Sequence, residues 1–391
     1  MDIHIIVKNK KFIIALLIAL AIKISLFIYA EIHAPQAKFQ TDSIIYTQTA
    51  ENLAKHGAFT RHYNDDGSYS PHLLRTPGYP FFLAILHGKM KIPYSGVILI
   101  QIVLTILVAF ITYKTALNIN PRFAYLSALI VLFDSPVTIF SLMLLTETVF
   151  LFLISIFMYL FILYLKEKKI KFIILSALIV ATLTYVRPVG YFFGIATGVF
   201  IIYFMIRMKL KKLLIHLLIF LIIVYSLIGL WHLRNYRVSG KNTFSTVTLL
   251  AASYRKVLIN NDELTRTLPK IPYYVNVVSR SLVFLMTKPG TLKNFNSPTL
   301  KQIGKIIGYP WMVFWLIGFL VGISKVEKNF YLQFLLFVVL YFICASIAGI
   351  LFGVSSRQRM PMVPFIAILS AHGWIWIASL LKKKGIEGSR A

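Results

Sequence analysis

Long apolar runs separated by short polar connections recur along nearly the whole chain. A helix needs about 20 apolar residues to cross the hydrocarbon core of a bilayer. Runs close to this length lie near residues 12–30, 95–117, 122–140, 147–165, 172–187, 189–206, 213–231, 308–323, 330–351 and 361–381. The pattern predicts an all-α polytopic membrane protein with about ten transmembrane helices.

The basic residues of the short connections predict the orientation. Lys and Arg gather before the first run, near 114–122, 166–171, 207–212 and 325–328, and after 381. All of these positions fall on one side of a ten-span arrangement, so the positive-inside rule places both termini in the cytoplasm. A further span within 271–287 would break this parity. That stretch contains Arg280 and is predicted to lie at the membrane interface.

Two long segments, 31–94 and 232–307, then lie on the outer face of the membrane. Loops of this length usually carry function. The first is expected to hold two short interfacial helices, one from Thr41 to about Lys55 that Gly57 ends, and one within the apolar stretch 81–87. The sequence has no internal repeat, so residues 1–391 are predicted to form a single integral membrane domain.

The composition agrees with a membrane protein, and it shows a large excess of positive charge that needs an explanation. Of the 391 residues, 58% are hydrophobic and 14% charged, which excludes an ordinary water-soluble enzyme. Lys and Arg number 41 against 13 Asp and Glu, a net charge of +28. Such a surplus could serve nucleic acid, but in a membrane protein it suits anionic lipid or phosphate. The single cysteine, Cys344, excludes a disulfide framework.

Because acidic residues are scarce, each one expected on the outer face is a candidate. Asp42 lies a few residues beyond the first run, at the start of the predicted interfacial helix. One interpretation is a helix N-cap, a position that Asp fills well. The other is a carboxylate at the membrane surface that takes a proton from an acceptor hydroxyl. The sequence leaves both open.

Glu147 follows Thr146 at the outer end of the fourth run. A helix N-terminus attracts an acid electrostatically, so capping and catalysis are again both open. Asp134 precedes Ser135-Pro136 and is predicted to initiate a turn. Glu51 and the loop acids Asp65, Asp66, Asp262 and Glu263 are expected to be solvated.

Four arginine positions meet the outer boundary at separate places in the sequence. They are Arg75 before Thr76-Pro77, Arg187 before Pro188, Arg234 after the seventh run, and the pair Arg357 and Arg359 before the last run. A guanidinium can anchor to lipid headgroups, and it also matches the oxygens of a bound phosphate. A shared anionic ligand at the outer face is therefore a candidate.

Several familiar sites are missing from the sequence. It contains no Walker loop, no dinucleotide-binding GxGxxG and no HExxH. Without a nucleotide site, a synthetic reaction on the outer face needs a preactivated substrate, and a lipid-phosphate-linked sugar fits. No His, Asp and Glu cluster at ligand spacing establishes a metal, so a divalent ion is left open.

The chain resembles the bacterial GT-C membrane glycosyltransferases, the group that includes the dolichyl-phosphate-mannose protein mannosyltransferases and the aminoarabinose transferase of lipid A. Four features carry the resemblance, in order. They are Asp42 with Ile45-Tyr46, Ala50-Glu51-Asn52-Leu53, Gly57 and Arg75-Thr76-Pro77-Gly78-Tyr79-Pro80; Leu145-Thr146-Glu147; Trp231-His232-Leu233-Arg234-Asn235-Tyr236 with Gly240; and Arg357-Gln358-Arg359-Met360-Pro361 with Pro364.

The resemblance implies a polyprenyl-phosphate-sugar donor and inversion at the anomeric carbon. Asp42 would be the catalytic carboxylate and Glu147 a second acid near the acceptor or a divalent ion. The donor phosphate would be bound by arginines, listed by position as Arg75, Arg187, Arg234, Arg357 and Arg359. The expected enzyme transfers a hexose or pentose to a glycolipid, polysaccharide or protein acceptor on the outer face of the cytoplasmic, or inner, membrane. Nucleic acid is not expected as a partner.

Two other functions compete with this expectation. A transporter or flippase of lipid-linked oligosaccharides would place its charges in a cavity between helices and often shows two related halves. An O-antigen polymerase or ligase also acts on the outer leaflet and uses arginines on a lipid diphosphate. The early Asp42 and the Thr146-Glu147 pair favour the single-sugar transferase.

Overall fold

The computed structural model describes residues 10–247, 253, 269–288, 298–326, 329–350 and 355–388. Throughout these ranges the regular structure is helical. The described residues form no β-strand, and a single isolated bridge joins Tyr63 to Tyr69.

Eight stretches of the described chain are long and apolar enough to cross a membrane. They lie along the helices α2 (Lys10–His33), α5 (Tyr94–Ile119), α8 (Thr146–Glu167), α10 (Phe193–Arg207), α11 (Leu213–Ser239), α15 (Pro298–Ile323), α16 (Phe330–Ile350) and α18 (Val363–Gly388). The apolar helix α9 (Ile170–Val186) has 17 residues. The prediction of an all-α polytopic membrane protein is confirmed.

One predicted span is broken into two helices. The run 122–140 forms α6 (Pro121–Leu132) and α7 (Ser135–Ser141), which are bent by 50° relative to each other. The break lies at Asp134, whose side chain accepts a hydrogen bond of 3.1 Å from the backbone N–H of Val137 and so caps α7. The expected turn at Asp-Ser-Pro is confirmed, and the expectation of one continuous helix is wrong.

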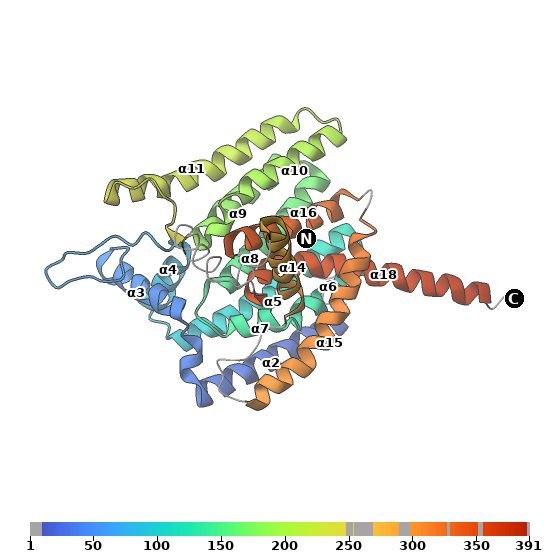
Figure 1. The fold of residues 1–391 in the computed structure, drawn as a ribbon, viewed down its shortest axis with the longest axis horizontal. Coiled ribbons are helices and arrows are strands. Elements are labelled where there is room, and N and C mark those ends of the chain that lie inside the picture. The colour runs from blue at the N-terminus through green and yellow to red at the C-terminus, as the bar shows by residue number, and fades with distance from the viewer. Residues whose placement is uncertain are drawn as a thin grey trace.

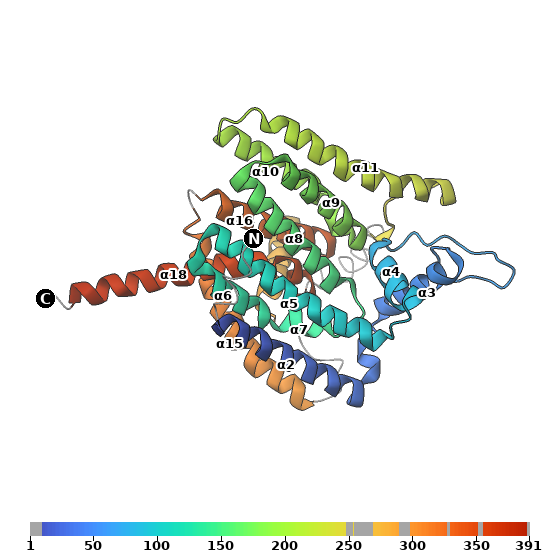
Figure 2. The same ribbon diagram turned by 180° about the vertical axis from the view of Figure 1, so that it is seen from behind.

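The helices form a bundle with α8 and α18 at its centre. Helix α8 packs between α5 and α9, and α18 packs between α6 and α15. Figures 1 and 2 show α11 at one edge of the bundle and α2 with α15 at the opposite edge. Large apolar side chains on these edge helices, such as Leu17, Ile222 and Leu320, are exposed. An apolar outer surface is what a lipid environment requires.

The first long loop forms a small helical layer at one end of the bundle. It contains α3 (Thr41–His56), α4 (Gly78–Leu83) and a π-helical turn over Ala84–Lys89. Gly57 ends α3 in the left-handed conformation, with φ of +69°, as predicted. Figure 1 shows α3 and α4 at the opposite end from the C-terminal part of α18, which projects from the bundle.

The second long loop is described in part. Helix α14 (Lys270–Thr287) covers the stretch predicted to lie at the interface, and it is not among the stretches apolar enough to span. Residues 248–252, 254–268 and 289–297 lie outside the described residues, and the predictions for acids in 254–268 lie there too. Helix α15 begins at Pro298, ten residues before the predicted run at 308.

A close helix crossing joins α15 to α18. A Cβ atom built on Gly322 would lie 2.0 Å from the carbonyl oxygen of Leu369, and one on Gly373 would lie 1.9 Å from that of Gly318. Small residues spaced four apart allow such contact between membrane helices. The Gly322→Ala substitution is expected to reduce stability by about 1–3 kcal/mol, because backbone atoms must move to admit the methyl group.

Thermal unfolding of the detergent-purified protein checks this prediction. The matched control is Gly229→Ala in α11, where a Cβ would meet no atom within 4 Å. We expect the midpoint of thermal unfolding to be lower for Gly322→Ala than for the wild type, and to be unchanged for Gly229→Ala. Equal midpoints for the two variants would contradict the close crossing.

Candidate active site

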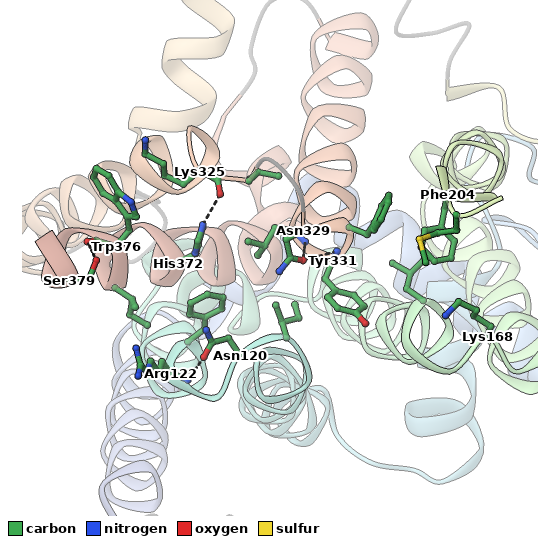
Figure 3. Close-up of a pocket in the computed structure, with 18 residues that line it drawn as sticks. Asn120, Arg122, Lys168, Phe204, Lys325, Asn329, Tyr331, His372, Trp376 and Ser379 are labelled. Carbon is green, nitrogen blue, oxygen red and sulfur yellow. Dashed lines mark hydrogen bonds between the residues drawn. The ribbon is translucent and has the colours of Figure 1, made fainter. Parts of the chain in front are cut away.

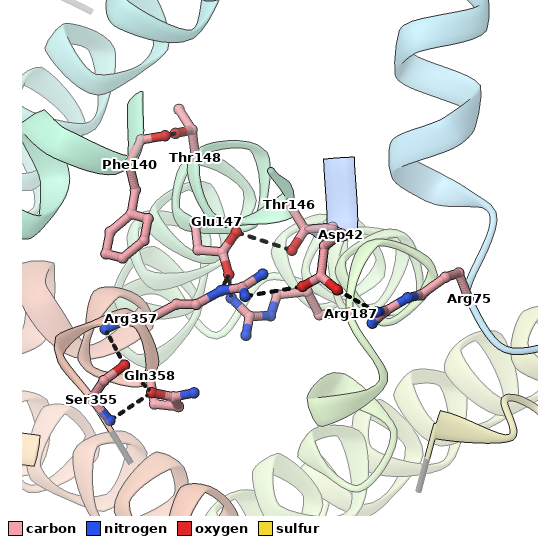
Figure 4. A network of polar contacts seen from close by, with 10 residues as sticks. All are labelled: Asp42, Arg75, Phe140, Thr146, Glu147, Thr148, Arg187, Ser355, Arg357 and Gln358. Carbon is pink, nitrogen blue, oxygen red and sulfur yellow. Dashed lines mark hydrogen bonds and ion pairs between the residues drawn. The ribbon is translucent and has the colours of Figure 1, made fainter. Parts of the chain in front are cut away.

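Two carboxylates and three arginines from distant parts of the chain form one ion-pair network (Figure 4). Arg357 connects the two acids: its Nη1 lies 3.0 Å from Oδ2 of Asp42, and its Nε donates to Oε1 of Glu147. Arg75 Nη2 lies 2.5 Å from the other oxygen of Asp42. Arg187 Nη1 lies 2.8 Å from Glu147 Oε1.

Asp42 is the second residue of α3, but it does not cap that helix. The N-cap is Gln40, which forms a reciprocal capping box with Ser43. The carboxylate of Asp42 is therefore free to accept from Arg75 and Arg357, and its side chain keeps 22% of its surface exposed. The interpretation of Asp42 as an N-cap is wrong.

Glu147 lies deeper in the protein. It is the second residue of α8, and its carboxylate side chain is fully buried between Arg187 and Arg357. Oε2 of Glu147 also accepts a 3.3 Å hydrogen bond from the hydroxyl of Thr146. A buried carboxylate is stable only when it is paired, and two guanidinium groups supply that pairing.

The two arginines beside Glu147 come from the ends of other helices. Arg187 follows the last residue of α9 in an extended conformation, and its guanidinium lies 5.8 Å from the ring centroid of Phe150. Arg357 is in the short helix α17 (Ser356–Arg359), which leads into α18. The side chains of Ser355 and Gln358 form a capping box there and so hold the turn that carries Arg357.

Aromatic and amide side chains support the network, and among them Gln101 was not singled out from the sequence. Tyr46 lies one turn after Asp42, and its ring centroid is 5.5 Å from the Arg75 guanidinium, a cation–π contact. Tyr79 packs edge-on against Tyr46 and donates a 2.9 Å hydrogen bond to Gln101 in α5. Burial raises the pKa of both tyrosines, which stay neutral. Both tyrosines belong to the motifs that carry the family resemblance, whereas no sequence pattern marked Gln101.

The Thr76-Pro77-Gly78 turn seats the first loop directly beside Arg187. Thr76 donates a 3.2 Å hydrogen bond to the carbonyl oxygen of Val186. A Cβ on Gly78 would lie 2.8 Å from the backbone of Tyr185 and Val186, so glycine permits the close approach. The turn thereby places Arg75 at the end of α9.

The structure places the other two predicted arginines outside this network. Arg234 stacks over Trp231, with its carbon 4.8 Å from the ring centroid, and donates to Asn235. Arg359 is buried, and its Nη1 donates to the carbonyl oxygens of Leu285 and Met286 at the end of α14. These contacts tie Arg359 to the second long loop.

The remaining outer acids divide into two kinds. Asp66 is exposed and accepts a 2.9 Å hydrogen bond from the backbone of Ser68 in the predicted turn. Glu51 differs from its expected solvated state, because it is half-buried and accepts a 2.9 Å hydrogen bond from the hydroxyl of Tyr94 at the start of α5. This bond joins α3 to the bundle.

His72 is a titratable group next to the network. The centroid of its ring lies 5.9 Å from that of Phe59, and its buried Nε2 has no hydrogen-bond partner within the described ranges. Burial, followed by the charges of Arg61, Arg75 and Arg234, lowers the pKa of His72 from 6.5 to about 4. His72 is therefore neutral at physiological pH.

This shift predicts an acid-sensitive first loop. Between pH 6.5 and about 4 the unfolded chain binds a proton at His72 that the folded chain does not, so stability falls as the pH drops through this window. We expect His72→Phe, which keeps a ring without the titration, to lose less thermal stability from pH 7.5 to pH 5 than the wild type loses. Parallel losses would contradict the assignment.

The carboxylates have little capacity left for a metal ion. No group of three or more His, Cys, Asp or Glu side chains in the described part of the chain could hold one. Three oxygens of Asp42 and Glu147 contact guanidinium groups, and the fourth accepts from Thr146. In this arrangement the two carboxylates therefore do not fit a divalent ion.

Comparison with known proteins identifies the fold. No protein-family model matches the sequence, and no curated protein matches it. Among solved structures, the chain is similar to the archaeal oligosaccharyltransferase AglB from Archaeoglobus fulgidus in complex with an inhibitory peptide and a dolichol-phosphate. The TM-score is 0.59 at 13% identity, over 98% of this chain and 52% of that one.

Two further structures are similar to the chain. AglB from Archaeoglobus fulgidus in complex with zinc and sulfate gives a TM-score of 0.57 at 15% identity, over 94% of this chain and 49% of that one. ArnT from Cupriavidus metallidurans bound to undecaprenyl phosphate gives a TM-score of 0.45 at 12% identity, over 93% of this chain and 77% of that one. The chain spans about half the length of the AglB chains. It is a multi-pass membrane protein with the fold of a GT-C glycosyltransferase, as its resemblance to that group implies.

Proposed function

We propose that the protein transfers a sugar from a polyprenyl phosphate to an acceptor hydroxyl. The observation that carries the proposal is the bridge that Arg357 makes between Asp42 and Glu147, with Arg75 and Arg187 at its two ends. The arrangement combines a partly exposed carboxylate, suited to take a proton, with guanidinium groups suited to a phosphate.

The charges of the network match such a donor. Three guanidinium groups and two carboxylates leave one positive charge in excess. A sugar linked to a lipid through a phosphodiester carries one negative charge and would neutralise the site. The arginines then act where negative charge develops on the leaving phosphate.

The reaction is a single displacement. The acceptor oxygen attacks the anomeric carbon while Asp42 takes the acceptor proton, and the bond from that carbon to the phosphate oxygen breaks with inversion. The lipid phosphate leaves with a second negative charge, and the proton on Asp42 balances it. The sum of charges at the site is therefore the same before and after transfer.

Donor binding has to rearrange the ion pairs. Both oxygens of Asp42 now accept from guanidinium groups, so at least one must be released before Asp42 can serve as a base. A phosphate that takes over Arg357 and Arg75 would release it. Glu147, buried and paired with Arg187, would keep Arg187 and Arg357 in place during this exchange.

The fold supports a lipid-linked donor. The chain shares its fold with AglB, an oligosaccharyltransferase whose structure holds a dolichol-phosphate. We further propose that the site lies on the outer face of the cytoplasmic (inner) membrane, with both termini inside. Glycolipids, polysaccharides and proteins are the acceptor classes. Arg234, which stacks on Trp231, is proposed as a further contact for the donor or the acceptor. The hydrogen bonds of Arg359 to backbone carbonyls favour a structural role.

Transfer assays in proteoliposomes test this function. A panel of labelled polyprenyl-phosphate hexoses and pentoses is presented with envelope glycolipids, polysaccharide and protein as acceptors. The proposal predicts a labelled product of inverted configuration and free polyprenyl phosphate. Movement of an intact glycolipid across the bilayer without sugar release would support a flippase, and consumption of a lipid diphosphate alone would support a polymerase or ligase. Either result would contradict the proposal.

The same assay tests the role of metal. Because arginines already neutralise both carboxylates, turnover is expected to be unchanged in excess EDTA. Loss of turnover in EDTA, with recovery on addition of one divalent ion, would show that an ion replaces guanidinium groups at Asp42 or Glu147 during the reaction.

A further inference from the structure

A cavity lined by charged, polar and apolar side chains lies among the helix connections at the end of the bundle away from the Asp42–Glu147 network. Figure 3 shows the residues that line it. Its volume is about 910 Å³, and the connections α5–α6, α8–α9, α10–α11 and α15–α16 surround it together with α18. Helix α8 begins at the Glu147 site and ends at Glu167, directly before the lining residue Lys168. Its 22 residues span roughly 33 Å, about the thickness of the hydrocarbon core.

The lining has cations at the connections and apolar side chains between them. Arg122, Lys168 and Lys325 supply the charges, and none of the described lining residues is acidic. Phe123 and Leu332 are among the buried apolar residues of the wall. A ligand that fits this lining carries a negative headgroup and an apolar body.

Two of the cations have no counter-ion among the residues that the structure describes. Within the described part of the chain, the side chains of Arg122 and Lys168 form no ion pair, and the carboxylate of Glu167 beside Lys168 is instead 2.7 Å from Lys169. The ammonium Nζ of Lys325 lies 4.6 Å from the ring centroid of Trp376, a cation–π contact that places this charge at the wall of the cavity. The charges are thus available to an external anion.

We propose that this cavity binds the phosphate headgroup of an anionic phospholipid from the adjoining leaflet. Basic pockets between membrane helices at the cytoplasmic side suit such headgroups. By the positive-inside prediction, the loops around the cavity face the cytoplasm. The lipid would join five parts of the bundle, and binding to the folded protein alone would stabilise it. The proposal is independent of the chemistry at Asp42.

Titration of lipids into the detergent-purified protein tests the site. Native mass spectrometry counts bound lipid, and thermal unfolding follows its effect. Dioleoyl phosphatidylglycerol is the anionic probe, dioleoyl phosphatidylcholine the neutral one, and a polyprenyl phosphate the carrier-type alternative. The variant is Arg122→Gln with Lys168→Gln and Lys325→Gln, and we expect it to bind phosphatidylglycerol on the order of 100-fold more weakly.

The control removes the same charge from the same end of the bundle. It combines Lys171→Gln, Lys211→Gln and Lys212→Gln, all exposed and outside the lining. Phosphatidylglycerol binding that survives in the control and is lost in the cavity variant supports the proposal. Equal weakening in both variants, equal binding of phosphatidylcholine, or binding of polyprenyl phosphate alone would each overturn it.

Photo-crosslinking tests the site in the wild-type protein, so its result does not depend on whether a variant folds. A phosphatidylglycerol with a photoreactive group near its headgroup is expected to label peptides around Lys325 and Trp376. Labelling confined to other surfaces would overturn the proposal.

Discussion

Replacement of Asp42 by Asn is expected to lower sugar transfer by about 10²–10⁴-fold, the range that a general base contributes. The amide keeps the shape of the side chain but cannot accept the acceptor proton. It also removes one negative charge from a network that already carries an excess of positive charge. The measurement is kcat of the purified protein with the donor that the panel identifies.

The matched control is Asp65→Asn in the exposed turn of the same loop. It removes the same charge without contact with the network, so transfer and thermal stability should stay at wild-type values. Donor binding should also survive in Asp42→Asn, because the arginines are freed rather than lost. Undiminished turnover in Asp42→Asn would eliminate Asp42 as the base.

Replacement of Arg357 is the second change expected to lower transfer strongly, because this side chain contacts both carboxylates. Removing one group that stabilises developing charge costs about 10²–10³-fold in rate. Lysine should not rescue the loss, since a single ammonium cannot reach Asp42 and Glu147 in the forked geometry of the guanidinium. We expect Arg357→Lys and Arg357→Gln to lower kcat and to raise the KM for the donor.

Arg237→Gln provides the control for charge alone. Arg237 is exposed near the end of α11, outside the network, and its loss should leave kcat and KM unchanged. The Arg357 variants must also elute as folded protein, because Glu147 loses a partner in them. Folded Arg357→Lys with normal kinetics would remove Arg357 from the proposed phosphate site.

Hydropathy is sufficient to predict the helices because a bilayer imposes a minimum apolar length on each one. The turn chemistry also allows precise local prediction: Asp134 breaks its run, and Gly57 ends α3. The start of α15 could not be predicted, since the residues before 308 are less apolar and extend the helix beyond the hydrophobic run.

The site could be predicted in its composition but not in its pairing. Asp42 and Glu147 were singled out because acidic residues are scarce on the predicted outer face. The arginines were singled out because they lie at the predicted outer boundary of the membrane. However, Arg75 and Arg234 are predicted at the same outer boundary of the membrane, and Arg357 and Arg359 both directly precede the last span. The sequence therefore cannot tell which arginine of each pair joins the network. Tertiary packing separates them: the Gly78 turn brings Arg75 to α9, and α14 engages Arg359.

The capping of α3 shows why local sequence misjudges an acid. Asp42 is a favourable N-cap residue, but Gln40, two residues earlier, is the N-cap and forms a capping box with Ser43. The carboxylate is therefore not needed by the backbone and is available to Arg75 and Arg357. Glu51 was misjudged for a similar reason, because its partner Tyr94 lies 43 residues away in sequence.

A cryo-EM structure with a non-hydrolysable phosphonate analogue of the donor tests the central claim most directly. The account predicts phosphonate oxygens at about 2.7–3.2 Å from the guanidinium nitrogens of Arg357 and Arg75. It also predicts that the ion pair between Asp42 and Arg357 is broken, with Asp42 facing the anomeric carbon. A headgroup bound elsewhere, with Arg357 still bridging Asp42 and Glu147, would contradict the account.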